Sequence, residues 1–267
     1  MKPIVDYRLF DGAIEFYIFG KKTSDFDLES VHIAQIARKL DVREILWPDT
    51  HTFNALVLEP VGSNQCQTTD GVTICRGFVA DGTVIPLGQA ACFRTADCPT
   101  IIAHHDFTHE VIAAHAGRES LIDEGGWKLA HPYRKNESIV DSVLRRLSKY
   151  DRFNKRARDI EIFSCCGVGA NNFRHSTAFG HQHSKDNFLR NQYIATNYGD
   201  DCFLDNDVDE GALDLHRLIA KQCESYCLPL DNIHHDAIDT ARDRDWFFSR
   251  RGGDKTGSNT ILVIRRA

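Results

Sequence analysis

The chain has 267 residues, of which 42% are hydrophobic and 26% are charged, a balance typical of globular proteins. This composition excludes disorder as the main state, and the net charge of −6 argues against the basic surface that nucleic-acid binding needs. No apolar run approaches the roughly 20 residues that span a membrane. Acidic residues also interrupt the N-terminal segment, where a signal peptide would need an apolar core. We therefore predict a cytoplasmic protein without nucleic-acid or membrane partners.

Strands and helices are both predicted, in an irregular order. Alternating apolar residues predict a strand at 14–19, and apolar residues three and four apart predict a helix over 30–40. Short β-rich runs predict further strands at 44–47, 55–58, 91–93, 100–103, 111–114, 160–163 and 260–264. Two later helices are expected, one capped by Asn136 and one by Asp209. The strands do not alternate regularly with helices, which favours an α+β fold, and no linker divides residues 1–267 into two domains.

One long segment shows neither a helix nor a strand pattern. Residues 175–209 are polar and lack a clear hydrophobic period, so we expect an active-site loop or an insertion there.

The nine cysteines are an odd number in a chain without a secretion signal, which argues against a disulfide framework. We expect eight of them to be small buried hydrophobes or surface thiols, and Cys98 alone to take part in chemistry.

Three predicted strand ends each carry a residue that binds soft or borderline metals. These residues are His51, Cys98 and His115, each with small or polar neighbours. Two nitrogens and one thiolate suit zinc or copper, and three protein ligands leave the fourth position that catalytic zinc needs. The residues alone leave two alternatives open. Cys98 and His115 could form a metal-free nucleophile pair, or all three could be structural.

At these residues the sequence resembles the laccase-domain family, also called multicopper polyphenol oxidase-type proteins, whose members are identified as purine nucleoside phosphorylases. Ala96-Asp97-Cys98 and the Ala-Ala-His-Ala-Gly segment at 113–117 match family motifs, whereas the first motif keeps only His51. Further segments that resemble the family, in chain order, are 80–82, 168–173, 213–215, 247–251 and 256–257.

The resemblance implies a single α+β domain with a two-layer mixed β-sheet core flanked by helices. It also implies zinc held by His51, Cys98 and His115, and phosphorolysis of purine nucleosides with adenosine deamination as a second activity. The expected partners are a purine nucleoside and phosphate, in a monomer or homodimer. Copper is the alternative metal, for a phenol oxidase. That chemistry would need additional ligands such as His104, His105 or His109, which are interpreted more simply as surface histidines.

The remaining site residues follow from the same motifs. Asp97 or Asp81 would act as general base, orient a ligand histidine or contact substrate, although a turn role also explains Asp81. Arg250 and Arg251 would hold phosphate, or form a solvated basic turn. Phe173 would stack on the purine, or pack in the core.

The sequence also departs from the family. Its N-terminal Thr-Arg-x-Gly-Gly-x-Ser segment is absent, so Lys21, Lys22 or Arg118 would have to replace the lost arginine. This departure keeps two further hypotheses open. One is a metal-independent hydrolase or deamidase built on Cys98 and His115. The other is a degenerate, non-catalytic member that still binds metal.

Overall fold

Thirteen strands in the described part of the chain form two sheets. The computed structural model describes residues 2–23, 28–50, 56–58, 65–122, 137–150, 157–178, 180 and 183–267. The seven-stranded sheet has the order β1-β2-β13-β8-β3-β6-β5 and the six-stranded sheet β12-β11-β9-β10-β7-β4. The first comprises β1 (Val5–Leu9), β2 (Ile14–Phe19), β3 (Glu44–Leu46), β5 (Gln65–Thr69), β6 (Val72–Arg76), β8 (Ala90–Thr95) and β13 (Asn259–Arg265). The second comprises β4 (Val57–Leu58), β7 (Gly82–Ile85), β9 (Thr100–His105), β10 (Val111–His115), β11 (Ile160–Cys165) and β12 (Ile233–His235).

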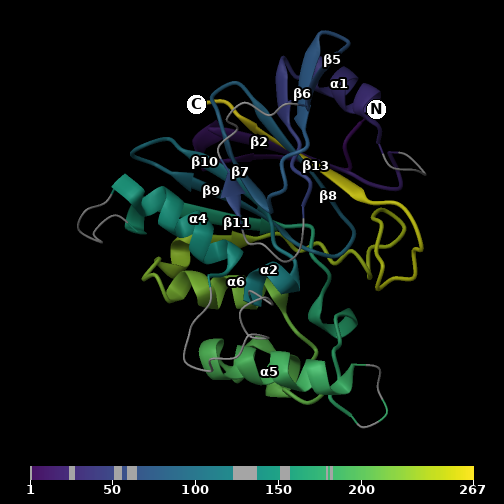
Figure 1. Ribbon diagram of the computed structural model, residues 1–267, viewed down its shortest axis with the longest axis vertical. Helices are drawn as coiled ribbons and strands as arrows, with labels where there is room; N and C mark the ends of the chain where they lie inside the picture. Colours follow the sequence, from purple (N-terminus) through teal and green to yellow (C-terminus); the bar gives the residue numbers. More distant parts are fainter. Residues whose placement is uncertain are drawn as a thin grey trace.

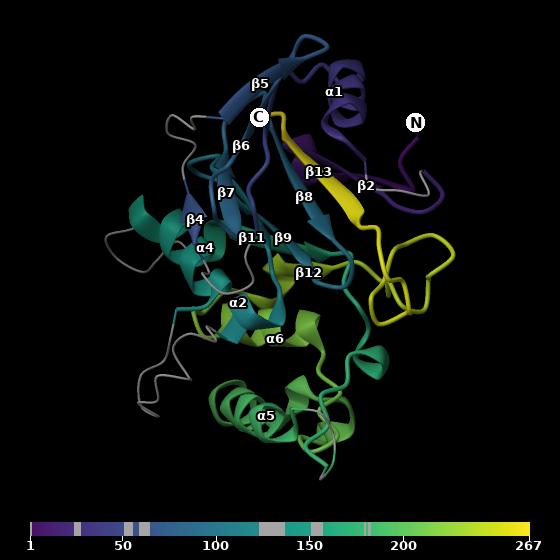
Figure 2. The same cartoon turned by 45° about the vertical axis from the view of Figure 1, so that its right-hand side comes forward.

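The two sheets lie face to face between helices, which gives four layers (Figures 1 and 2). Helix α1 (Ser30–Lys39) packs on the outer face of the seven-stranded sheet through an apolar cluster that includes Ile33. The outer face of the six-stranded sheet is covered by α2 (Arg118–Ile122), α4 (Ile139–Leu147) and α6 (Leu215–Glu224). Helix α5 (Ser184–Tyr198) lies beyond α6 in both views. Short 3₁₀ turns are η1 (Phe10–Gly12), η2 (Ser148–Tyr150), η3 (Ala157–Asp159), η4 (Ala170–Asn172), η5 (Asp200–Cys202), η6 (Leu204–Asn206) and η7 (Leu230–Asn232).

Period-two alternation explains the core between the sheets. Phe16 and Ile18 of β2 and Phe93 of β8 face Ile102 of β9 and Ala113 of β10, and all five are fully buried. Burying each large side chain stabilises the fold by about 1.5–3 kcal/mol. The predicted α+β class with a two-layer mixed sheet flanked by helices is therefore confirmed, and so is the strand predicted at 14–19.

Two predictions about the early strands and the cysteines need correction. The strands β5 and β6 were not predicted. β5 is largely exposed and polar, whereas β6 buries Val72, Ile74 and Cys75. They pair antiparallel with Cys66 directly opposite Cys75, and these two residues form a disulfide. The expectation of free thiols is therefore wrong for this pair. The spacing of nine residues gives no signal of the pairing until the hairpin register is known.

The later helices begin at other residues than predicted. Helix α4 is capped by Ser138, whose hydroxyl accepts from the Asp141 N–H at 3.1 Å; the predicted cap Asn136 lies outside the described residues. Helix α6 is capped by Asp214 rather than Asp209, because antiparallel bridges hold Ala212 and Leu213 extended. An extended segment cannot belong to the first turn of a helix, so the helix starts at Leu215.

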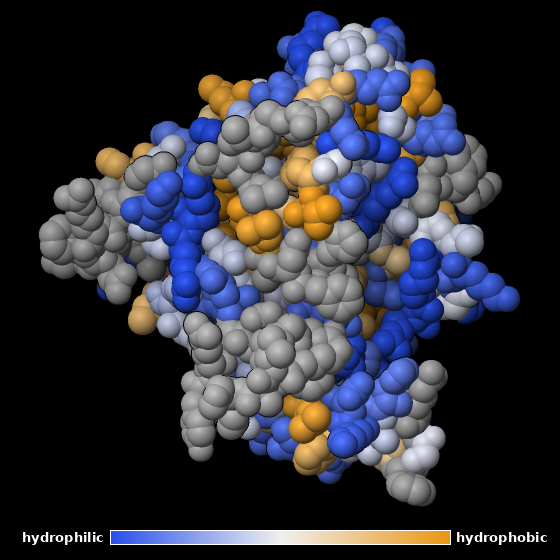
Figure 3. All heavy atoms as spheres, viewed as in Figure 1, coloured by the Kyte–Doolittle hydropathy of each residue, from blue (hydrophilic) through white to orange (hydrophobic). Residues whose placement is uncertain are grey.

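The polar segment 175–209 contains a helix rather than an irregular loop, so of the two expectations only an insertion stays a prediction. The buried face of α5 is formed by Asn187, Arg190, Asn191, Ile194 and Tyr198, spaced as on one helix face but mostly polar. Phe188 and Leu189 are exposed instead, and a hydrophobic patch is visible over α5 in Figure 3. Because polar residues face inward here, hydrophobic periodicity did not reveal the helix. None of the helices described is long and apolar enough to cross a membrane.

Candidate active site

Strand pairing brings Cys98 and His115 to the same edge of the six-stranded sheet. Cys98 lies in the turn between β8 and β9, and His115 is the last residue of β10. His115 pairs with Thr100, and the next residue, Ala116, donates its N–H to the Pro99 carbonyl at 2.8 Å. The Cys98 side chain lies within hydrogen-bonding reach of His115. Two of the three predicted metal ligands are thus neighbours; the third, His51, lies outside the described residues.

Asp81, the residue just before strand β7, supports His115. Its carbonyl accepts the His115 N–H at 2.7 Å, and its fully buried carboxylate lies 3.9 Å from His115 Nδ1. The following residue is Gly82, where a Cβ would come within 2.9 Å of the Ala114 Cβ. Glycine therefore permits the close approach of β7 and β10 that places Asp81 against His115.

The electrostatics of this edge favour a charged His115 in the absence of metal. Burial disfavours the charged imidazolium, but the Cys98 thiolate and the Asp81 carboxylate outweigh it and raise the pKa of His115 to about 10. The Cys98 and His115 side chains are therefore electrostatically coupled. A metal ion would replace the proton between them, because zinc binds deprotonated thiolate and neutral imidazole.

The two predicted ligands that the structure describes, Cys98 and His115, fit a zinc or copper site. Cys98 offers a soft sulfur within reach of the imidazole of His115, which is 5% exposed. A sulfur ligand beside imidazole is typical of borderline and soft metals rather than of magnesium or calcium. His51 would complete the predicted set.

Asp97, predicted as a catalytic residue, is the centre of a buried hydrogen-bond network. Its carboxylate accepts from the Thr240 hydroxyl at 3.0 Å, the Ser249 hydroxyl at 2.5 Å and the Arg251 N–H at 3.0 Å. Its own carbonyl accepts from the Val168 N–H. These contacts tie the C-terminal motif at 247–251 to the turn that carries Cys98, which gives Asp97 a positioning role. A general-base role stays a prediction.

A cavity of about 600 Å³ opens near this edge and is rich in arginine. Arg118, Arg190 and Arg251 line it together with His175. Arg118 and Arg190 are buried, with 8% and 9% of their surface exposed. Buried guanidinium groups are costly unless they are paired with anions, and Glu119 pairs with Arg118 at 2.8 Å. The excess of positive charge makes the cavity a candidate anion site.

His175 bridges two of these arginines as a neutral ring. Its Nδ1 lies 2.6 Å from Arg118 Nη1 and its Nε2 lies 3.2 Å from Arg251 Nη2. Burial and the charges of Arg118, Arg251 and Arg190 lower the pKa of His175 to about 2. The neutral ring therefore adds no positive charge of its own, and its single acceptor nitrogen can accept a hydrogen bond from one of the two guanidinium groups.

The low pKa of His175 predicts a loss of stability in acid. The unfolded imidazole takes up a proton below pH 6.5, whereas the folded ring stays neutral until about pH 2, so the free energy of unfolding falls as the pH drops through this window. We expect a contribution of about 1 kcal/mol per pH unit below pH 6. Urea unfolding of the wild type and His175→Gln between pH 7 and 4 measures it. Parallel pH profiles for the two proteins would contradict the assignment.

The other predicted substrate residues are placed differently. Arg251 lines the cavity, but the exposed Arg250 does not, and its Nη1 donates weakly to the Asp254 carbonyl. Phe173 is buried in the core, and the Arg251 guanidinium lies 5.0 Å from its ring centroid. This packing supports the structural alternative for Phe173, and its stacking on a purine stays a prediction.

Sequence reasoning missed several residues that build the site. Thr240 and Ser249, which are distant in sequence, donate hydrogen bonds to Asp97, and Arg190 of α5 lines the cavity. These residues form no sequence motif with one another or with Asp97. The one usable signal was the C-terminal resemblance, which contains Ser249 and Arg251.

A second group of ligand residues lies at the other end of β9. The ligand atoms of His104, Asp106 and Glu161 all lie within 4.8 Å of one another. The interpretation of His104 and His105 as surface histidines is wrong, because they are 4% and 1% exposed. β9 is a central strand, and both of its faces are covered.

Solved structures share this fold across nearly the whole chain. The Bacillus licheniformis hypothetical protein YfiH is 17% identical, with a TM-score of 0.68 over 94% of this chain and 92% of that one. YlmD from Geobacillus stearothermophilus is 15% identical, with a TM-score of 0.69 over 95% and 92% of the two chains. The Neisseria meningitidis protein NMB0706 is 14% identical, with a TM-score of 0.65 over the whole of both chains. No curated protein is similar enough in sequence to count as a relative.

Fold and site together define a two-sheet α+β protein with a cysteine–histidine pair at one sheet edge. The sequence family described as multi-copper polyphenol oxidoreductase laccase matches residues 30–266. The chain belongs to this laccase-domain family, and the resemblance inferred from its motifs is confirmed.

Proposed function

We propose that the protein is a zinc-dependent purine nucleoside phosphorylase. The proposal rests mainly on the arginine-lined cavity. Two of its arginines are connected to the predicted ligands, one to His115 and one to the neighbour of Cys98. Arg118 follows His115 by three residues, and the Arg251 N–H donates to Asp97, the neighbour of Cys98. A dianion such as phosphate matches the charge of this cavity. Phosphorolysis is a reaction in which bound phosphate is the nucleophile.

The chain's own residues supply binding and orientation in this reaction. Arg118, Arg190 and Arg251 would hold phosphate so that one oxygen attacks C1′ of the nucleoside. The C1′–N9 bond breaks, its electron pair leaves with the purine, and ribose 1-phosphate forms. Asp81 would orient His115. Zinc held by His51, Cys98 and His115 would supply Lewis-acid catalysis when bound.

The phosphate site predicts a specific kinetic defect in Arg118→Gln. Loss of one charge-assisted contact to phosphate should raise KM for phosphate by roughly 10- to 100-fold. We expect a much smaller effect on KM for inosine. Arg242→Gln, on an exposed arginine paired with Asp243, is the matched control and should leave both constants unchanged. Initial rates of hypoxanthine release at varied phosphate measure the effect; a change in KM for inosine alone would place phosphate elsewhere.

A metal-independent Cys98–His115 hydrolase or deamidase is the second candidate, because the two side chains are in contact. A thiolate beside imidazolium is the reactive form of such pairs. Chelator treatment distinguishes the candidates, since it would abolish a zinc-dependent activity and leave this one intact. Ammonia release from adenosine tests deamination in the same assay. Absence of turnover with every purine nucleoside would favour a non-catalytic, metal-binding member.

A further inference from the structure

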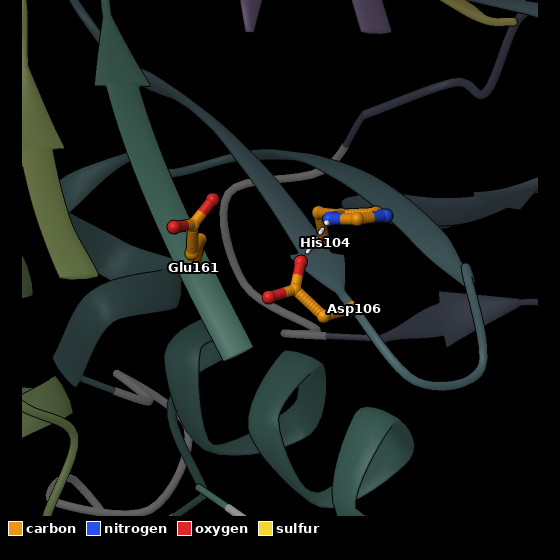
Figure 4. A group of neighbouring side chains, drawn as sticks. All are labelled: His104, Asp106 and Glu161. Atoms are coloured by element: carbon orange, nitrogen blue, oxygen red, sulfur yellow. Dashed lines mark ion pairs between the residues drawn. The ribbon is translucent and has the colours of Figure 1, made fainter. Parts of the chain in front are cut away.

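A buried histidine and two carboxylates converge where β9 and β11 lie side by side (Figure 4). Glu161 of β11 pairs in register with His104 of β9, and Asp106 follows two residues after His104. Because side chains alternate along a strand, His104 and Asp106 share the face of Ile102, and Glu161 shares the face of Phe163. Both faces look toward the other sheet, since Ile102 and Phe163 belong to the core between the sheets.

His104 is positioned as a ligand rather than as a hydrogen-bonding core residue. It is 4% exposed, and neither ring nitrogen has a hydrogen-bond partner among the described residues. Nδ1 is turned toward the cluster, 3.2 Å from Asp106 Oδ1, as Figure 4 shows. Phe10 stacks on the ring with 5.3 Å between the centroids and fixes its plane. A buried polar group without a hydrogen-bond partner calls for a physical explanation, and a bound ion is one of the common ones.

The cluster is open enough for an ion to reach it. The Asp106 side chain is 61% exposed, while Glu161 is partly buried. One imidazole and two carboxylates form a mixed nitrogen and oxygen donor set, which suits divalent transition metals such as zinc, manganese or iron. Three protein ligands are fewer than such ions coordinate, so water would supply the remaining ligands.

We propose that His104, Asp106 and Glu161 bind a divalent transition-metal ion at a second site, distinct from the Cys98 site. The two sites lie toward opposite ends of β9, since His115 pairs with Thr100 whereas Val111 pairs with His104. Four residues along a strand correspond to about 13 Å. Glu161 is a neighbour of neither Cys98 nor His115, so this ion would not take part in the reaction proposed above.

Zinc titration of Cys98→Ser protein tests this site with the proposed catalytic site disabled. After chelator treatment and dialysis, calorimetry with ZnCl₂ should still show about one bound ion per chain. Glu161→Gln and Asp106→Asn in the same background should each weaken that binding at least tenfold. Asp245→Asn, which changes an exposed acidic residue that does not belong to the cluster, is the matched control and should not. Both test substitutions preserve side-chain shape, and thermal melting checks that the variants are folded.

The outcomes separate this inference from the proposed function. Two zinc ions per wild-type chain, one lost in Cys98→Ser and the other in Glu161→Gln, would support both. One zinc in the wild type that is lost in Cys98→Ser would overturn the second site and leave the proposed function standing. Cobalt gives an independent check: the second site should show visible ligand-field bands without the thiolate charge-transfer band that Cys98 would produce. No cobalt spectrum in folded Cys98→Ser protein would also overturn the inference.

Discussion

Cys98→Ser is expected to lose both the zinc of the proposed catalytic site and the phosphorolysis of inosine. A serine hydroxyl keeps its proton near neutral pH and is a poor zinc ligand, so the site would retain only its histidines. We expect kcat/KM for inosine to fall by about 10³-fold or more, the scale on which loss of an essential group acts. The fold should persist, because Cys98 lies in a turn and is only partly buried. Metal analysis and hypoxanthine release measure the two effects on one preparation.

Cys227→Ser is the matched control, because Cys227 is an exposed free cysteine remote from this edge in sequence. It should keep full zinc content and full activity. Activity that survives in Cys98→Ser would contradict the proposed role of the sulfur. Zinc retained without activity would instead point to Cys98 as a nucleophile rather than a ligand.

Asp97→Asn is expected to destabilise the protein more than it impairs chemistry. The Asp97 carboxylate accepts hydrogen bonds from the Thr240 and Ser249 hydroxyls and the Arg251 N–H. The asparagine side chain would keep one acceptor oxygen, but its NH₂ group would face at least one of these donors. Hydrogen bonds to a charged buried group contribute about 1.5–3 kcal/mol each, so we expect a net loss of about 2–4 kcal/mol. For a chain of this size the melting temperature should fall by roughly 5–10 °C.

The exposed Asp245→Asn is the control for Asp97→Asn and should melt like the wild type. Thermal melting followed by kcat against pH on the folded fraction separates the two roles of Asp97. A positioning role predicts a lowered melting temperature with an unchanged pH profile. Unchanged stability with loss of the acidic limb of the kcat profile would show instead that Asp97 is the general base.

The sequence predicted those parts of the fold that depend on local apolar patterns. The central strands, such as β2 and β10, bury both faces or alternate clearly, and their positions follow from hydrophobicity alone. Helix α5 was missed because Arg190 and Asn191 lie on its buried face, where tertiary contacts override the usual pattern. The disulfide between Cys66 and Cys75 was missed because it depends on the register of two strands.

The candidate site was predictable only where motifs lie next to strand ends. Cys98 and His115 were found because each lies at the end of a predicted strand in a segment that matches a family motif, and the structure brings them together. The arginine cavity could not be derived, since Arg118, Arg190 and Arg251 come from three distant segments. The cluster around His104 was not predicted either, because its residues come together only through the pairing of β9 with β11.

The most direct test is the dependence of inosine cleavage on phosphate and zinc, in protein purified without chelator. Zinc-dependent phosphorolysis predicts hypoxanthine and ribose 1-phosphate in equal amounts, no cleavage without phosphate, and recovery when zinc is returned after chelation. Release of free ribose without phosphate, or activity that survives chelation, would contradict it.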